Sequence, residues 1–157
     1  MRAIERDQKM KHYTIGIDFG TLSGRAVLMD AESGEIIASS VYEYPHAVMS
    51  EALPSGTELP NGTALQHPGD YIEVLKKTIP DVIRQANIAT EQVVGLGIDF
   101  TACTMLPVDE SFTPLCLNPE YEGEPHAYVK LWKHHTAQDE ADELNRIAAE
   151  KNEPWLK

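Results

Sequence analysis

Short apolar runs separated by turn-forming residues dominate the first 45 positions of the chain. Residues 12–19 (HYTIGIDF) and 25–30 (RAVLMD) are separated by Gly-Thr-Leu-Ser-Gly, and a third run, residues 35–44, ends before Pro45. Runs of this length that are rich in β-branched and aromatic residues are typical of strands joined by tight turns. The pattern predicts a three-stranded antiparallel meander.

A loop and a helix are expected next. Residues 45–68 have no clear period and are rich in Pro, Gly, Ser and Thr, so we expect a long loop or a small insertion that is a candidate for a functional flap. Asp70 and Glu73 resemble a capping box, and the helix that follows should be kinked or split at Pro80. Its expected apolar face comprises Ile72, Leu75, Ile79, Val82, Ile83 and Ala86.

The remaining sequence predicts a buried strand, a hairpin and a second helix. Residues 93–100 (VVGLGIDF) are almost all apolar, which predicts a central parallel strand that is buried on both faces of a sheet. Residues 104–108 should open a hairpin that turns at Asp109, and Thr136 with Asp139 predicts a capped helix. That helix would place three apolar residues on one face, namely Ala141, Leu144 and Ala148. Together these elements indicate a mixed α/β fold.

Composition narrows the classes of function. The chain has 157 residues, 25 of them acidic and 13 basic, and its formal charge of −12 disfavours binding to nucleic acid or to an anionic membrane. Its two cysteines, Cys103 and Cys116, match neither a metal-binding spacing nor a disulfide framework, which fits the cytoplasm. Neither a signal peptide nor a membrane span is expected. Residues 1–10 are charged and unpatterned, so we expect a disordered extension.

The loop after the first strand carries residue types that suit a triphosphate. Gly20 and Gly24 allow close approach and positive φ angles, and consecutive turn amides can bind an anion. Thr21 and Ser23 add hydroxyl groups, and Asp18 supplies a carboxylate for Mg²⁺. An ordinary glycine-rich hairpin would contain the same residues. On these residues alone, both interpretations stay open.

An internal repeat favours the phosphate-binding interpretation. The sequence Gly-Ile-Asp-Phe occurs at residues 16–19 and again at 97–100, each time at the end of an apolar strand. If these strands are neighbours, Asp18 and Asp99 lie together at the edge of the sheet where α/β proteins bind ligands. Chance could also produce the repeat. We assign a function to Asp18 and leave Asp99 open.

The small residues 101–104 (TACT) follow the second copy and leave room for a polyol. Cys103 is expected to be a small core residue rather than a nucleophile. Trp132 is likewise expected in the core, and the adjacent His134 and His135 point in different directions on a helix, which disfavours a shared metal site.

Three segments resemble the FGGY carbohydrate kinases. Residues 18–25 match the pattern Asp-x-Gly-Thr-x-Ser-x-Arg of that family. Residues 97–107 (GIDFTACTMLP) and 125–135 (PHAYVKLWKHH) resemble its ribulokinase branch in particular. The resemblance extends from about Lys11 to the end of the chain.

The resemblance implies an actin-like ATPase fold of the ribonuclease H type, with residues 11–157 forming the N-terminal part of the first of two domains. It implies phosphorylation of L-ribulose by ATP and Mg²⁺ to L-ribulose 5-phosphate, in arabinose breakdown. The residues implied at the ATP phosphates are Asp18, which also faces the metal, Gly20, Thr21 and Ser23. Those implied at the sugar are Phe100, Thr101, Ala102 and Cys103. Arg25 is expected to support the hairpin.

The sequence departs from other branches of the family at two places. Glycerol kinases have Arg-Glu where this chain has Ala102 and Cys103, and xylulose kinases have Trp-x-Asp-x-Arg where it has residues 132–136. Trp132, Lys133 and His134 therefore remain only candidates for the pocket.

Gly123 is the only glycine after Gly97, so a second glycine-rich phosphate loop and a Gly-Gly adenosine motif are not expected in these residues. We therefore expect a fragment that is inactive alone, with the catalytic base beyond residue 157. A homo-oligomer of the full-length enzyme stays open. The alternatives are a metal-dependent nuclease of the ribonuclease H class and a non-catalytic nucleotide- or sugar-binding module.

Overall fold

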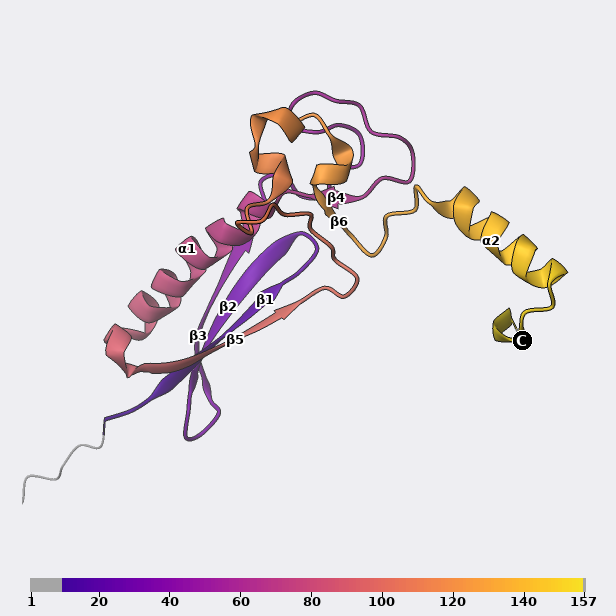
Figure 1. Cartoon of the computed structure of the whole chain (residues 1–157). Coiled ribbons are helices and arrows are strands. Elements are labelled where there is room, and N and C mark those ends of the chain that lie inside the picture. Colours follow the sequence, from indigo (N-terminus) through magenta and orange to yellow (C-terminus); the bar gives the residue numbers. More distant parts are fainter. Residues whose placement is uncertain (1–9, 157) are drawn as a thin grey trace, which may run out of the picture. The chain divides into compact units, whose positions relative to one another are not determined.

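A computed structural model describes residues 10–156, so the expected extension lies outside the described residues except for Met10. The chain forms two compact units (Figure 1). The first contains the residues up to Ala47 together with Pro68–Ala102, and the second contains Val48–His67 and the chain from Cys103 onward. Among the described residues, no helix is long and apolar enough to cross a membrane.

The first unit is a four-stranded sheet with one long helix, α1 (Pro68–Ala86), on one face. Its strands are β1 (Tyr13–Phe19), β2 (Ser23–Asp30), β3 (Ile36–Glu43) and β5 (Val93–Phe100), in the order β3-β2-β1-β5. β1, β2 and β3 are antiparallel neighbours, whereas β5 runs parallel to β1. The predicted meander and parallel strand are confirmed.

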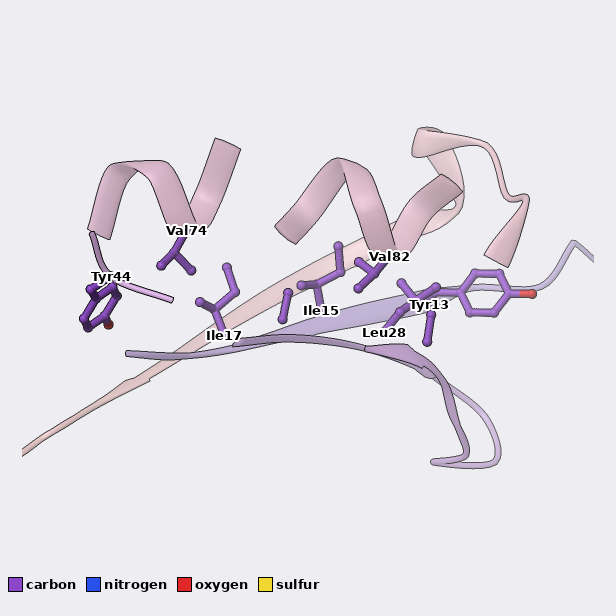
Figure 2. Packing of buried hydrophobic residues seen from close by; sticks show 9 residues of the cluster. Tyr13, Ile15, Ile17, Leu28, Tyr44, Val74 and Val82 are labelled. Atoms are coloured by element: carbon purple, nitrogen blue, oxygen red, sulfur yellow. The ribbon is translucent and has the colours of Figure 1, made fainter. Parts of the chain in front are cut away.

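Alternation along the strands builds the core of this unit. Ile15 and Ile17 of β1 and Leu28 of β2 are at most 2% exposed, because successive residues of a strand point to opposite faces of the sheet. Val74 and Val82 of α1 are fully buried against them (Figure 2). The polar positions between these residues lie on the open face of the sheet.

The helix differs from its predicted form at both its start and its middle. It begins at Pro68, and the Asp70 carboxylate accepts hydrogen bonds from the backbone N–H and ring Nδ1 of His46 instead of forming the expected capping box. It continues without a break through Pro80. Pro80 is exposed, so water can solvate the carbonyl that its missing N–H leaves unpaired. Ile72, expected on the apolar face, is 51% exposed.

Strand β5 is not buried as predicted. It is an edge strand of the described sheet, and α1 packs chiefly on β2 and β3. Its alternate apolar side chains are therefore more than half exposed, namely Val94, Leu96, Ile98 and Phe100. The apolar run predicted the strand correctly but not its surroundings.

The second unit has its own apolar core and little regular structure. Its core includes Met49, Leu53, Leu65, Cys116 and Tyr128. The predicted loop 45–68 supplies Met49, Leu53 and Leu65 of this core. The other elements are β4 (Leu65–Gln66) paired with β6 (Val129–Lys130), short 3₁₀ helices at Leu115–Leu117, Pro119–Tyr121, Pro125–Ala127 and Pro154–Leu156, and the helix α2 (Gln138–Glu150).

Two local predictions for this unit are wrong. Residues 104–108 form only isolated bridges, although Asp109 makes the expected turn and accepts from the N–H groups of Ser111 and Thr113. Helix α2 has Ala137 at its N-cap, without a side-chain cap. The hydroxyl of Thr136 lies 2.7 Å from His134 Nε2 instead.

His134 helps to join residues 62–64 to residues 131–135 within this unit. Its Nδ1 accepts a hydrogen bond from the Ala64 N–H at 3.2 Å, next to bonds from Leu131 N–H to Ala64 O and from His135 N–H to Gly62 O. Accepting at Nδ1 requires that this nitrogen carry no proton. Partial burial, Lys130 and the neighbouring histidines lower the pKa of His134 below its usual value.

We therefore expect the stability of this unit to fall in mild acid. The pKa of His134 is lower in the folded chain than in the unfolded chain. The contribution of His134 to the free energy of unfolding is therefore complete above the unfolded pKa of about 6.5 and is lost as the pH falls through the folded pKa. Chemical denaturation at a series of pH values would measure this. His134→Asn, whose amide oxygen can still accept from Ala64 N–H, should flatten the profile, whereas an unchanged profile would contradict the assignment.

Candidate functional site

The hairpin between β1 and β2 is a tight turn at residues 20–22. The Gly20 N–H donates to Ser23 O at 3.0 Å, and a Cβ built on Gly20 would lie 3.0 Å from the same oxygen. Neither Gly20 nor Gly24 has a positive φ angle, so that expectation is wrong. Both positions instead need glycine because other groups approach closely.

Gly24 joins the hairpin to the core. A Cβ at this position would meet both methyl groups of Val74, one of them at 2.6 Å. Val74 is fully buried and belongs to α1. The helix therefore packs directly on the backbone where β2 leaves the hairpin.

The two copies of Gly-Ile-Asp-Phe lie side by side. β1 and β5 pair in parallel with Gly16 opposite Gly97 and Asp18 opposite Asp99. Both carboxylates are exposed, and they share the face of the sheet opposite the buried Ile17. The sequence repeat thus reflects two neighbouring strands in register, which is the condition under which Asp18 and Asp99 lie together.

A shallow hollow of about 290 Å³ lies on this open face. Its lining residues are Gly16, Ile17, Asp18, Arg25, Val27 and Asp99. Arg25 stands opposite Asp18 in the β1–β2 register. Carboxylate oxygens are the ligands that Mg²⁺ prefers, and the side chain of Arg25 can pair with a phosphate oxygen. The donor set therefore fits a metal–phosphate group.

The turn after β5 is tied to the hairpin. Thr101 N–H donates to Phe19 O at 3.3 Å, which joins the ends of the two strands. Phe100 is 66% exposed, and Ala102 is exposed as well. The first unit therefore brings the expected phosphate-binding segment and residues 100–102 of the expected sugar-binding segment together at one end of the sheet.

Cys103 differs from the expected core residue. Its side chain is exposed, and its backbone has φ = 57°, in the left-handed region that residues other than glycine rarely adopt. The chain changes direction here, at the first residue of the second unit. Trp132, also expected in the core, is 60% exposed and lies in a turn.

An aromatic cluster next to the hairpin was not predicted from the sequence. The rings of Phe19 and Tyr71 meet edge to face at 5.6 Å, and those of Tyr44 and Tyr71 at 5.7 Å. Tyr44 N–H also donates to Leu22 O at 2.9 Å. These residues are far apart in the sequence, and only the register of the meander would have placed Tyr44 beside the hairpin.

Comparison with known proteins shows the family. The pattern of the FGGY family of carbohydrate kinases, N-terminal domain, matches residues 13–153. The chain belongs to this family. Among curated FGGY relatives, the ribulokinase of Shouchella clausii is 58% identical over 148 residues, which are 94% of this chain and 26% of that protein. The ribulokinase of Geobacillus thermodenitrificans is 58% identical over 147 residues, 93% of this chain and 26% of that protein.

Solved structures show the FGGY fold. The gluconate kinase of Lactobacillus acidophilus superposes with a TM-score of 0.67 at 17% identity, over 88% of this chain and 23% of that one. The xylulose kinase of Rhodospirillum rubrum gives 0.62 at 15% identity, over 86% and 23%. The predicted fold class is confirmed. The chain spans about a quarter of the length of the curated relatives it matches.

Proposed function

We propose that this chain forms the phosphate-binding hairpin and part of the sugar pocket of a kinase that transfers phosphate from ATP to L-ribulose, giving L-ribulose 5-phosphate. The observation that carries the proposal is the paired end of β1 and β5, which joins the hairpin, two carboxylates and the turn after β5. The identity of 58% to ribulokinases supports this choice of sugar. Arabinose breakdown in the cytoplasm is the corresponding setting.

The hairpin residues have distinct roles in this proposal. The hydroxyl groups of Thr21 and Ser23 bind the phosphate oxygens of ATP, together with turn amides other than that of Gly20, whose N–H is bonded to Ser23 O. The Asp18 carboxylate faces Mg²⁺ or its water shell. When bound, the metal neutralises the charge that develops during phosphoryl transfer. Asp99, in register with Asp18, adds a second carboxylate at the same edge.

The sugar contacts are proposed for residues 100–103. Phe100 offers an exposed ring, and the backbone of Thr101 is fixed by its bond to Phe19 O. Ala102 and Cys103 present small side chains that leave room for a ketopentose. No catalytic base is assigned to this chain.

A thermal-shift titration of the 157-residue chain tests the proposal. A ligand that binds only the folded state raises the melting temperature as its concentration rises. We expect stabilisation by Mg·ATP or L-ribulose. Stabilisation by a DNA–RNA hybrid alone would support the nuclease alternative instead, although the charge of −12 speaks against it.

Catalytic effects can be measured in a chimera, in which residues 11–157 replace the matching segment of the Shouchella clausii ribulokinase. In this chimera, Ala102→Leu should raise KM for L-ribulose by about tenfold, because overpacking a filled site costs about 1–3 kcal/mol. The KM for ATP should hardly change, since the hairpin is a separate segment. Steady-state kinetics with each substrate varied in turn would measure both constants.

Thr104→Val is the control, because it is nearly isosteric and lies two residues further along. An Ala102→Leu value of the L-ribulose KM within about twofold of the parent would contradict the sugar assignment. A parallel rise in both KM values with a lower melting temperature would identify Ala102 as a structural residue.

A further inference from the structure

A hollow of about 400 Å³ lies within the second unit. Its lining residues come from three segments, around Pro60, around Pro125 and at the start of α2. None of them belongs to residues 100–103, to which the sugar substrate is assigned. Small-molecule sites usually have volumes of about 300–1,000 Å³ and a few convergent polar groups. The hollow therefore has the size of a binding site that the proposed function does not use.

Hydrogen bonds fix the walls of the hollow. The N–H of His135 donates to Gly62 O at 2.8 Å, which joins two of the lining segments. The Glu124 carboxylate caps the 3₁₀ helix Pro125–Ala127 by accepting from the His126 N–H at 2.9 Å. Bonds of this kind hold the lining segments in place before a ligand binds. The hollow is therefore preformed.

One hydroxyl group at the hollow has a proton without an acceptor. His134 and Thr136 both line the hollow. The Nδ1 of His134 accepts from the Ala64 N–H, so the neutral ring carries its proton on Nε2. Nε2 lies 2.7 Å from Thr136 Oγ1 and is the donor in that bond. The Thr136 hydroxyl therefore accepts from His134, and its own proton pairs with no atom of the described residues.

The start of α2 supplies further donors. Ala137 is the N-cap of this helix and lines the hollow, and its side chain makes no capping bond. The first N–H groups of a helix have no partner within the helix. They point beyond its N-terminus, where the helix dipole favours an acceptor. A ligand in the hollow therefore meets donors from both Thr136 and the backbone of α2.

Two carboxylates provide acceptors at the same hollow. Glu124 and Glu140 both line it, and no lysine or arginine of the described chain does. The Glu140 carboxylate accepts no hydrogen bond from the described residues, and Glu124 accepts only at Oε1. The hollow is therefore negatively charged and offers acceptors as well as donors.

This combination selects the chemistry of the ligand. An anion such as phosphate is repelled by two carboxylates, and an ammonium group has no oxygen to accept from Thr136 or α2. At this hollow, no three acidic, histidine or cysteine side chains of the described residues come close enough to share a metal ion. A hydroxyl group both donates and accepts, so several hydroxyl groups on one molecule pair with all of these groups. The prolines and Ala137 offer apolar surface to its C–H groups.

We propose that the hollow binds a neutral polyol of about five or six carbons, such as a pentitol or a pentose. The carboxylates of Glu124 and Glu140 accept from its hydroxyl groups, whereas the Thr136 hydroxyl and the first N–H groups of α2 donate to its oxygens. His134 is a positioning residue, because its Nε2–H sets the direction of the Thr136 hydroxyl. The site does not depend on the proposed kinase function, and it is built from residues other than 100–103.

The test is an NMR titration of the ¹⁵N-labelled 157-residue chain with ribitol and with L-arabinose. The amide signals of residues 137–140 report the hollow, and those of Thr101 and Ala102 report the segment assigned to the sugar substrate. We expect saturable shifts of the signals of residues 137–140 with at least one of the two compounds. Inorganic phosphate and ethylammonium, as an anion and a cation, should not shift these signals at the same concentrations.

Glu140→Gln should weaken this binding by about tenfold, because it removes the charge of one acceptor and keeps its size. Thr136→Val, which is nearly isosteric, should weaken it by a similar factor. Asp139→Asn is the matched control, since Asp139 has the same charge in the same first turn of α2 but does not line the hollow. Its affinity should stay within about twofold of the parent. All three side chains are exposed, so the melting temperature should change little.

Several results would overturn the inference. They are the absence of a saturable shift at residues 137–140 with either compound, unchanged affinity in Glu140→Gln or in Thr136→Val, and an equal loss in Asp139→Asn. Shifts of these signals with phosphate or ethylammonium alone would identify an ion site and would also contradict the proposal. Shifts at Thr101 and Ala102 without any at residues 137–140 would support the proposed sugar segment but overturn the site in the hollow.

Discussion

Asp18→Asn in the chimera should lower kcat by on the order of 10²-fold, the usual scale for the loss of one preorganised electrostatic contact. Asn keeps the size of the side chain but removes the charge that faces Mg²⁺. The melting temperature should change little, because Asp18 is exposed at the end of β1 and is not part of the core. Steady-state kinetics at saturating Mg·ATP and L-ribulose, with a melting curve of the same sample, would measure both effects.

Asp99→Asn provides the comparison. Asp99 is in register with Asp18, but its Oδ1 accepts a hydrogen bond from the N–H of Phe100. A similar loss in both variants would show that the two carboxylates share one role, and a loss in Asp18→Asn alone would assign the metal to β1. Near-normal kcat in Asp18→Asn would make Asp18 an ordinary turn residue.

Gly24→Ala should lower the free energy of unfolding of the first unit by about 1–3 kcal/mol, the typical cost of overpacking a filled core. The added methyl group would overlap both methyl groups of Val74. Val74 is fully buried, and its β-branched side chain has few alternative rotamers, so it cannot move aside cheaply. Denaturant unfolding of the 157-residue chain would measure the loss.

Two further variants identify the cause. Gly16→Ala is the matched control in the neighbouring strand, because a Cβ there has no other atom within 4 Å, and it should leave stability unchanged or slightly raised. The double variant Gly24→Ala with Val74→Ala should lose less stability than the sum of the two single variants, since the new methyl group fills the space that Val74 vacates. A double variant whose losses simply add would contradict the packing argument.

The sequence predicted those features that depend on neighbouring residues. Alternation of apolar residues located β1 and β2. The repeated Gly-Ile-Asp-Phe raised the question whether Asp18 and Asp99 lie together, and the parallel pairing of β1 with β5 meets the condition on which that interpretation depended. The mixed α/β class followed from the order of these elements, whereas the actin-like ATPase fold was expected from the resemblance to the FGGY kinases.

The features that depend on distant packing could not be predicted in the same way. The apolar run of β5 gives its strand conformation, but its exposure depends on which strands α1 covers. Pro80 is tolerated because it lies on the exposed side of α1. The need for glycine at position 24 comes from Val74, which is 50 residues further along the chain and reaches the hairpin only through the fold.

The kinase activity of the unmutated chimera with L-ribulose decides whether residues 11–157 can serve as the N-terminal part of a ribulokinase. We expect release of ADP that depends on both ATP and L-ribulose, with a product identified by ³¹P NMR as L-ribulose 5-phosphate and with kcat/KM within about tenfold of the parent enzyme. A folded chimera that binds Mg·ATP but does not phosphorylate L-ribulose, or that prefers D-xylulose or glycerol, would contradict the proposed function.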